Sequence, residues 1–164
     1  MLLVLWDIDG TLVDSAGHGR HAFEDAYRAV VGRPFPGEVE MAGHTDHQIA
    51  MAMLGGEHER LPHMLEALAA GLAARKDRIR EEGSPFPGAR EALRALAERD
   101  DVVQSVLTGN LEANAALKLA AFGLDAFLDF MGFQFFTFQL FIAPLILVYT
   151  FSFNIIHRSG AGAG

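Results

Sequence analysis

The sequence predicts an α/β fold in which a parallel sheet is flanked by helices. Two apolar segments, residues 2–6 and 102–107, have the character of buried strands, and each ends in polar residues that suit a chemical site. Helical periodicity fills most of the chain around them, up to about residue 122. Strands that alternate with helices favour a parallel sheet, and ligands bind beyond the carboxyl ends of such strands.

The first segment stops at Asp7-Ile8-Asp9-Gly10-Thr11, which places two carboxylates at its carboxyl end. Its unbroken apolar character fits a strand that is covered on both faces. Two like charges so close are unfavourable unless a cation or a shared proton relieves them. An oxygen-binding divalent cation, Mg²⁺, is therefore the expected partner of Asp7 and Asp9. The alternative is a simple turn, in which Asp9-Gly10-Thr11 only reverses the chain.

Residues 15–84 carry helical patterns and no convincing strand. Helices are expected over residues 15–33, 45–54 and 61–82. Thr45 or Asp46 can act as the N-cap of the second helix. Two prolines and a glycine in residues 84–88 then suit a linker that returns the chain to the sheet. The sequence thus predicts a helical insert after the first strand.

The second strand follows a helix over residues 89–99 and ends in Thr108-Gly109-Asn110. A hydroxyl at a strand end, followed by a glycine, can bind a phosphate oxygen through its side chain and the main-chain N–H groups. The next helix, residues 111–122, stops at Gly123 and carries Lys118 among alanines and leucines. Lys118 is either a snorkelling surface residue or an electrostatic group for phosphoryl transfer.

Composition limits the classes of function. The chain has 164 residues, close to the size of one ordinary domain, so a catalytic domain with a second small unit is a tight fit. A net charge of −8 argues against nucleic acid as a partner, and the absence of cysteine rules out disulfides and thiolate metal sites. No basic leader precedes the first strand. A cytoplasmic protein that acts on a small molecule is expected.

The run Asp-x-Asp-Gly-Thr-Leu-Val-Asp-Ser after an N-terminal strand resembles the first motif of the haloacid dehalogenase-like (HAD) hydrolases, and Thr108 and Lys118 match the second and third motifs. The resemblance implies a Rossmann-like core over residues 1–14 and 85–130, with a helical cap over residues 15–84. It implies that Asp7 is the nucleophile and Asp9 the general acid and base, with Mg²⁺ between Asp7 and the phosphate. It also implies that Lys118 neutralises Asp7 and the transferring phosphoryl group. A second carboxylate at Asp9 favours phosphatases and phosphomutases over dehalogenases.

The resemblance also suggests residues that contact the substrate. Gly10, Thr11, Gly109 and Asn110 would line the phosphate position, and Asn110 would orient Asp7 or the substrate. Gly43-His44-Thr45-Asp46 is similar to a loop of capped phosphatases related to phosphoglycolate phosphatase, which makes His44 and Thr45 candidate specificity contacts. The alternative is that Thr45-Asp46 is only a helix N-cap.

The resemblance ends near residue 130. Residues 130–156 carry no charge, and no acid follows Asp129, so the fourth-motif acids that complete the family's metal site are missing. Asp125 and Asp129 are the only nearby substitutes. Residues 131–164 could span a bilayer, against the positive-inside tendency, could form strands, or could be foreign to the domain, which we favour.

The expected function is Mg²⁺-dependent hydrolysis of a small phosphorylated metabolite through an aspartyl-phosphate. The alternative is a catalytically impaired domain that acts as a binding or membrane-attached module. A phosphomutase is a third possibility.

Overall fold

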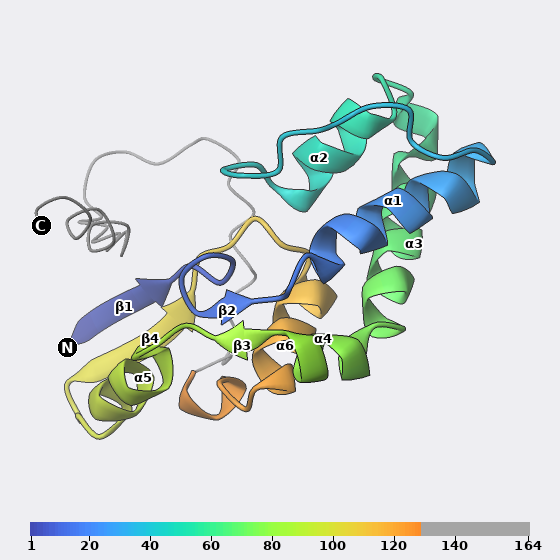
Figure 1. Ribbon diagram of the computed structural model, residues 1–164. Coiled ribbons are helices and arrows are strands. Elements are labelled where there is room, and N and C mark those ends of the chain that lie inside the picture. The colour runs from blue at the N-terminus through green and yellow to red at the C-terminus, as the bar shows by residue number, and fades with distance from the viewer. Residues whose placement is uncertain (129–164) are drawn as a thin grey trace, which may run out of the picture.

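The computed structural model describes residues 1–128, in which a small sheet-containing core adjoins a group of helices (Figure 1). The tail interpretations and Asp129 lie outside the described residues. Along the chain the elements are β1 (Leu2–Trp6), β2 (Val13–Asp14), α1 (His18–Val31), α2 (Asp46–Met53), η1 (His58–Arg60), α3 (Leu61–Ala73), α4 (Lys76–Glu82), β3 (Ser84–Pro85), α5 (Ala89–Ala97), β4 (Val102–Val106), α6 (Glu112–Ala121) and η2 (Asp125–Phe127).

The two predicted strands, β1 and β4, pair in parallel, as expected. Leu2 lies opposite Val102 and Trp6 opposite Val106, and the N–H of Leu107 continues the ladder to the carbonyl of Trp6 at 2.8 Å. The loops that follow β1 and β4 therefore leave the sheet at the same edge. The α/β fold with a parallel sheet flanked by helices and a helical cap after the first strand is confirmed.

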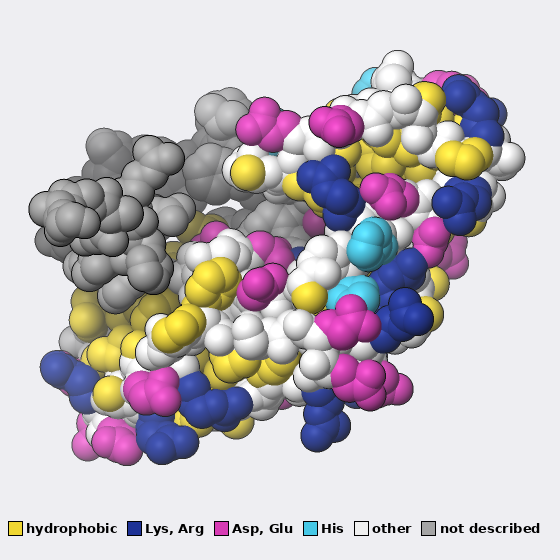
Figure 2. Space-filling model, viewed as in Figure 1, with side chains coloured by type: hydrophobic (Ala, Val, Ile, Leu, Met, Phe, Trp, Pro, Cys, Tyr) yellow, Lys and Arg dark blue, Asp and Glu magenta, His cyan; other side chains and the backbone are white. Residues whose placement is uncertain are grey.

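The expectation that β1 is covered on both faces is wrong for its first half within residues 1–128. Leu2 and Leu3 are 54% and 45% exposed, and Figure 2 shows hydrophobic side chains at the surface near the end where β1 begins. The physical reason is that, among the described elements, β1 packs mainly against β4, and the helix α5 packs against β4 rather than against β1. Its carboxyl end is better covered, which matters more for the site.

One buried polar side chain ties the core together. Gln104 of β4 is buried, accepts a hydrogen bond from the indole nitrogen of Trp6 at 3.0 Å, and donates to the carbonyl of Leu93 at 2.8 Å. Because its amide is paired on both sides, this buried group carries no desolvation penalty for lost partners. It joins β1 and α5 to the strand that leads to Thr108.

The strands β2 and β3 were not predicted. They form an antiparallel pair in which Val13 lies opposite Pro85 and Asp14 opposite Ser84, so the chain leaves and re-enters the core side by side. Two-residue strands are too short to show a period of two in the sequence. The pair occupies the position at which a linker was expected. The boundaries of the cap at residues 15 and 84 stay a prediction.

Gly83 directly precedes β3, and a larger residue could replace it only if neighbouring atoms moved. A Cβ on Gly83 would lie 2.5 Å from the carbonyl oxygen of Asp14 and 2.6 Å from that of Ile79. We expect Gly83→Ala to lower the free energy of unfolding by about 1–3 kcal/mol, as for other overpacked sites, measured by urea denaturation. Gly19→Ala is the control, because its Cβ would lie 3.9 Å from the nearest atom. Equal stability of the Gly83 variant and the unaltered chain would contradict this.

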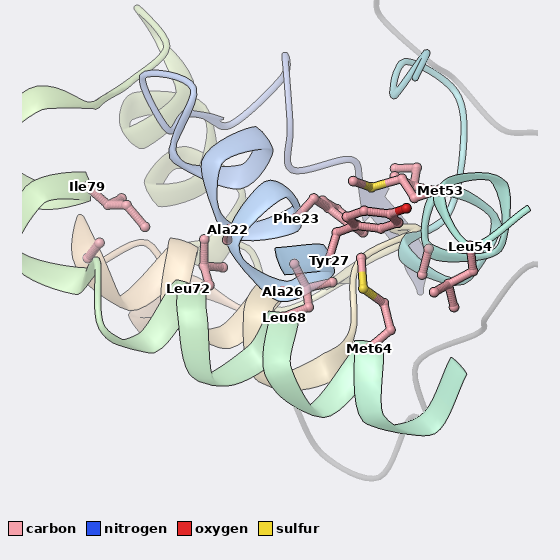
Figure 3. Close-up of a cluster of buried hydrophobic side chains, with 13 residues drawn as sticks. Ala22, Phe23, Ala26, Tyr27, Met53, Leu54, Met64, Leu68, Leu72 and Ile79 are labelled. Carbon is pink, nitrogen blue, oxygen red and sulfur yellow. The ribbon is translucent and has the colours of Figure 1, made fainter. Parts of the chain in front are cut away.

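The helices between β2 and β3 surround their own apolar cluster (Figure 3). Phe23 and Tyr27 of α1 point toward Met64 and Leu68 of α3, as the helical periodicity predicts. The members labelled in Figure 3 are Ala22, Phe23, Ala26, Tyr27, Met53, Leu54, Met64, Leu68, Leu72 and Ile79.

The single helix predicted over residues 61–82 is wrong, because the chain breaks between α3 and α4 at Ala74 and Arg75. The N–H of Arg75 turns to the carbonyl of Leu72, and its guanidinium donates to the carbonyl of Gly71 at 3.0 Å and pairs with Asp25 of α1. Neither glycine nor proline marks this break. A tertiary contact of a side chain therefore ends the helix.

Across residues 1–128, no helix combines the length and the apolar character that crossing a membrane requires.

Candidate active site

The loop after β1 is anchored by buried apolar residues that turn its acids outward. Ile8 and Leu12 are fully buried, and the Ile8 carbonyl accepts the N–H groups of Thr11, Leu12 and Val13 at 3.3, 2.9 and 2.9 Å. Gly10, with φ of 79°, provides the left-handed conformation that this tight turn requires. Side chains alternate along an extended segment, so burial of Ile8 places Asp7 and Asp9 on the opposite side.

Lys118 pairs with Asp9. Its Nζ lies 2.7 Å from both carboxylate oxygens of Asp9 and 2.6 Å from the side-chain oxygen of Asn110. The lysine side chain is 6% exposed and that of Asp9 47% exposed, so one partner is buried and the other is open to solvent. The interpretation of Lys118 as a snorkelling surface residue is wrong, because α6 directs it inward to Asp9 and Asn110, in the loops that follow β1 and β4.

The loop after β4 completes this network. The side-chain amide of Asn110 donates to Asp9 and to the hydroxyl of Thr108, both at 2.7 Å. The backbone N–H of Asn110 donates to the same hydroxyl at 3.2 Å. Thr108 and Asn110 are buried. The structure thus brings together residues that lie 99 to 109 positions apart, namely Asp9 with Thr108, Asn110 and Lys118.

Asp7 stands apart from the network. Within residues 1–128 no basic side chain pairs directly with it. Loss of surrounding water raises the pKa of the Asp7 carboxyl above its usual range, and the charge of Asp9 raises it further. The N–H of Ile8 and the more distant charge of Lys118 oppose this rise of the pKa. The ion pair of Lys118 is therefore with Asp9 and not with Asp7, the partner that the resemblance implies.

The cap loop Gly43–Asp46 meets the loop after β4. A Cβ on Gly109 would lie 2.8 Å from the Cα of Thr45 and 3.1 Å from the carbonyl oxygen of His44, so the two backbones approach through the space that a glycine leaves. The N–H of Asp46 donates to the carbonyl of Gly109 at 2.8 Å. His44 and Thr45 thus lie beside Gly109.

The side chains of His44 and Thr45 form hydrogen bonds within the helical insert itself. The Thr45 hydroxyl accepts the backbone N–H of Gln48 at 3.2 Å, and the side-chain oxygen of Gln48 accepts the backbone N–H of Thr45 at 2.9 Å. This reciprocal pair is a capping box. The His44 ring nitrogen Nδ1 lies 3.0 Å from the carbonyl of Ala42. The N-cap alternative describes Thr45 correctly. A contact of either residue with a substrate stays a prediction.

Asp46 is the functional candidate that the motif analysis missed. It lies in the first turn of α2, is 7% exposed, and accepts hydrogen bonds from the N–H of Leu111 at 2.7 Å and the amide of Asn114 at 3.0 Å. Burial raises the pKa of Asp46, while these two donors and Lys118 oppose the rise. Its sequence signals are an acid after an N-cap threonine, which is typical of many helices, and its place in the loop Gly43–Asp46.

The two acids of the loop after β1 provide part of a binding site for a hard divalent cation. Mg²⁺ commonly takes one or two carboxylates from a protein and the remaining oxygens from phosphate and water. Asp7 and Asp9 meet that number, and within residues 1–128 Asp7 has no directly paired basic side chain. In the described part of the chain no group of three His, Cys, Asp or Glu residues could hold a metal, so Asp125 does not complete such a site.

Comparisons with known proteins agree with this geometry. Residues 4–139 match the family model of haloacid dehalogenase-like hydrolases, past residue 130, where the resemblance of the motifs ends. No curated protein sequence matches the chain.

Solved structures share the fold. They include two predicted phosphoglycolate phosphatases, from Lactobacillus plantarum (19% identity, TM-score 0.57, 77% of this chain and 58% of that chain) and Haemophilus somnus (20%, 0.53, 77% and 59%). A hydrolase from Pseudomonas syringae has 22% identity and a TM-score of 0.51, over 73% of this chain and 53% of that one. The chain thus spans little more than half the length of these structures.

The family model covers most of the chain, residues 4–139 of 164. The chain belongs to the haloacid dehalogenase-like hydrolases.

Proposed function

We propose that the chain hydrolyses a small phosphate monoester and that Asp7 is the nucleophile. The observation that supports this most is that the two acids of one loop differ in their side-chain partners. Asp9 is held by Lys118 and Asn110, whereas Asp7 lacks a basic partner among the described residues. A nucleophilic carboxylate must be free to reach phosphorus, and an acid-base carboxylate must be fixed beside it.

The reaction would proceed in two balanced steps. A carboxylate oxygen of Asp7 attacks phosphorus, the bond from phosphorus to the ester oxygen breaks, and protonated Asp9 gives its proton to the departing alcohol. Asp9 then takes a proton from water, whose oxygen attacks the phosphorus of the aspartyl-phosphate. The bond between phosphorus and Asp7 breaks, inorganic phosphate leaves, and both acids return to their starting states.

Other residues of the chain would place the phosphoryl group and balance its charge. Thr108 and Gly109 would offer a hydroxyl and an N–H group at the end of β4, and Asn110 holds that hydroxyl beside Asp9. Lys118 supplies a buried positive charge near the position of the phosphate. Gly10 and Thr11 would contact the phosphate from the first loop, and His44 and Thr45 would contact the remainder of the substrate.

We expect turnover to require Mg²⁺, because the attacking carboxylate of Asp7 and the phosphate would both be negatively charged. Asp7 and Asp9 would hold the ion, which would offset charge on the phosphoryl oxygens. Treatment with EDTA should stop release of phosphate from an aryl phosphate, and excess Mg²⁺ should restore it. Calorimetry should also detect Mg²⁺ binding that Asp7→Asn weakens. Full turnover in EDTA would contradict the proposal.

The second candidate is an impaired domain that binds but does not hydrolyse. One observation favours it: within residues 1–128 no third acid joins Asp7 and Asp9 in a metal-binding group. This candidate predicts neither Mg²⁺ binding nor release of phosphate by the full chain. A phosphomutase is distinguished by transfer of phosphate to a sugar rather than to water.

A further inference from the structure

The beginnings of two helices, α2 of the cap and α6 of the core, face each other across the junction. The first N–H groups of a helix lack partners within the helix. At α2, the N–H of Asp46 donates to the carbonyl of Gly109 at 2.8 Å. At α6, the N–H of Leu111 donates to the carboxylate of Asp46 at 2.7 Å. At the start of each helix, one N–H group thus finds its acceptor across the junction between the cap and the core.

Helix α6 has no cap of its own. It begins after Leu111, whose side chain cannot accept a hydrogen bond. Asp46 provides an acceptor from outside the helix, because one of its oxygens takes both the backbone N–H of Leu111, the N-cap residue, and the side-chain amide of Asn114, at 2.7 and 3.0 Å. A carboxylate is also the charge that the start of a helix favours. A residue of the helical cap therefore holds the first residue of this core helix.

This contact lies one peptide unit from the catalytic network. The residue before Leu111 is Asn110, whose amide bonds Asp9 and Thr108 and whose oxygen accepts from Lys118. Lys118 lies about two turns further along the same helix. A shift of the start of α6 would consequently move Asn110 and Lys118 together relative to Asp9.

We propose that Asp46 is a positioning residue of the cap, which sets Asn110 and Lys118 against Asp9 only while the cap rests on the loop after β4. The proposal rests on the proposed hydrolysis, and it couples that chemistry to the seating of the cap. Gly109 contributes to the coupling, because a larger residue would separate the two backbones.

The test compares the full chain with Asp46→Ala, Asp46→Asn and Asp46→Glu, by kcat and KM for an aryl phosphate and by amide exchange at Leu111 followed by NMR. In Asp46→Ala we expect kcat to fall about tenfold to a hundredfold, as for misplaced catalytic groups, while KM changes by less than about twofold. Exchange at Leu111 should accelerate. Asp46→Asn should restore most of kcat, because its side-chain oxygen still accepts the N–H of Leu111.

The control is Glu112→Gln, which removes a negative charge from the first turn of α6 at an exposed position. It should leave kcat, KM and exchange at Leu111 unchanged. If Asp46→Ala does not fold, Asp46→Glu decides the question: its charge is retained but displaced by one methylene, and it should still lower kcat.

Unchanged kcat in Asp46→Ala, or an effect on KM alone, would overturn the positioning role. An original chain without turnover would overturn the proposed function instead. In that case exchange at Leu111 would still decide whether Asp46 holds the start of α6.

Discussion

Asp7→Asn should lower kcat/KM for an aryl phosphate by at least about 1,000-fold, as expected for loss of a nucleophile. The amide is a poor nucleophile and cannot form an aspartyl-phosphate. The variant should fold normally, because the Asp7 side chain lies at the surface of the loop and Ile8 and Leu12 provide its buried anchors. Its expected behaviour is thus loss of turnover with an unchanged melting temperature.

The matched control is Asp101→Asn. Asp101 precedes β4, at the opposite end of the sheet from Asp7, and is exposed. The Arg99 guanidinium, which bonds it at 2.8 and 3.0 Å, lowers the pKa of Asp101. The same chemical change there should leave kcat/KM unaltered. Turnover that survives Asp7→Asn would remove Asp7 from the mechanism and leave the impaired domain as the better hypothesis.

Most of the fold could be predicted because its long elements carry periodic patterns. The helix over 15–33 and the helix over 111–122 match α1 and α6 to within three residues at each end. The misses have a common cause. The break at Ala74–Arg75 depends on the ion pair of Arg75 with Asp25, 50 positions away, and the β2–β3 pair joins residues 70 and 72 positions apart. No local pattern contains such information.

In the site, too, local sequence patterns do not contain the contacts between side chains that lie far apart in the chain. Motif order located Asp7, Asp9, Thr108 and Lys118, but not which acid the lysine pairs with. That partner depends on the direction in which α6 leaves the sheet. Asp46 was missed because its role lies in a contact with Leu111 of the core, while its own segment carries an ordinary capping signal and a loop resemblance that indicated His44 and Thr45 instead.

Lys118→Met should lower kcat by about 100- to 1,000-fold, the range found when a preorganised electrostatic contact is removed. Methionine retains the apolar stem that packs inside the site but not the charge. Two consequences follow from the geometry. The transferred phosphoryl group loses a nearby cation, and Asp9 loses the partner that holds both its oxygens at 2.7 Å. The melting temperature should change little, because water can solvate the half-exposed carboxylate of Asp9.

Lys76→Met is the matched control, since Lys76 is the other lysine of the chain and lies exposed in α4. It should retain full activity. The pH profile of kcat separates two explanations of the Lys118 effect: loss of phosphate charge stabilisation lowers kcat at every pH, whereas loss of the contact with Asp9 also shifts the profile. A Lys118→Met variant with the original kcat would show that its ion pair with Asp9 is structural, and hydrolysis would then depend on Asp7, Asp9 and the loop after β4 alone.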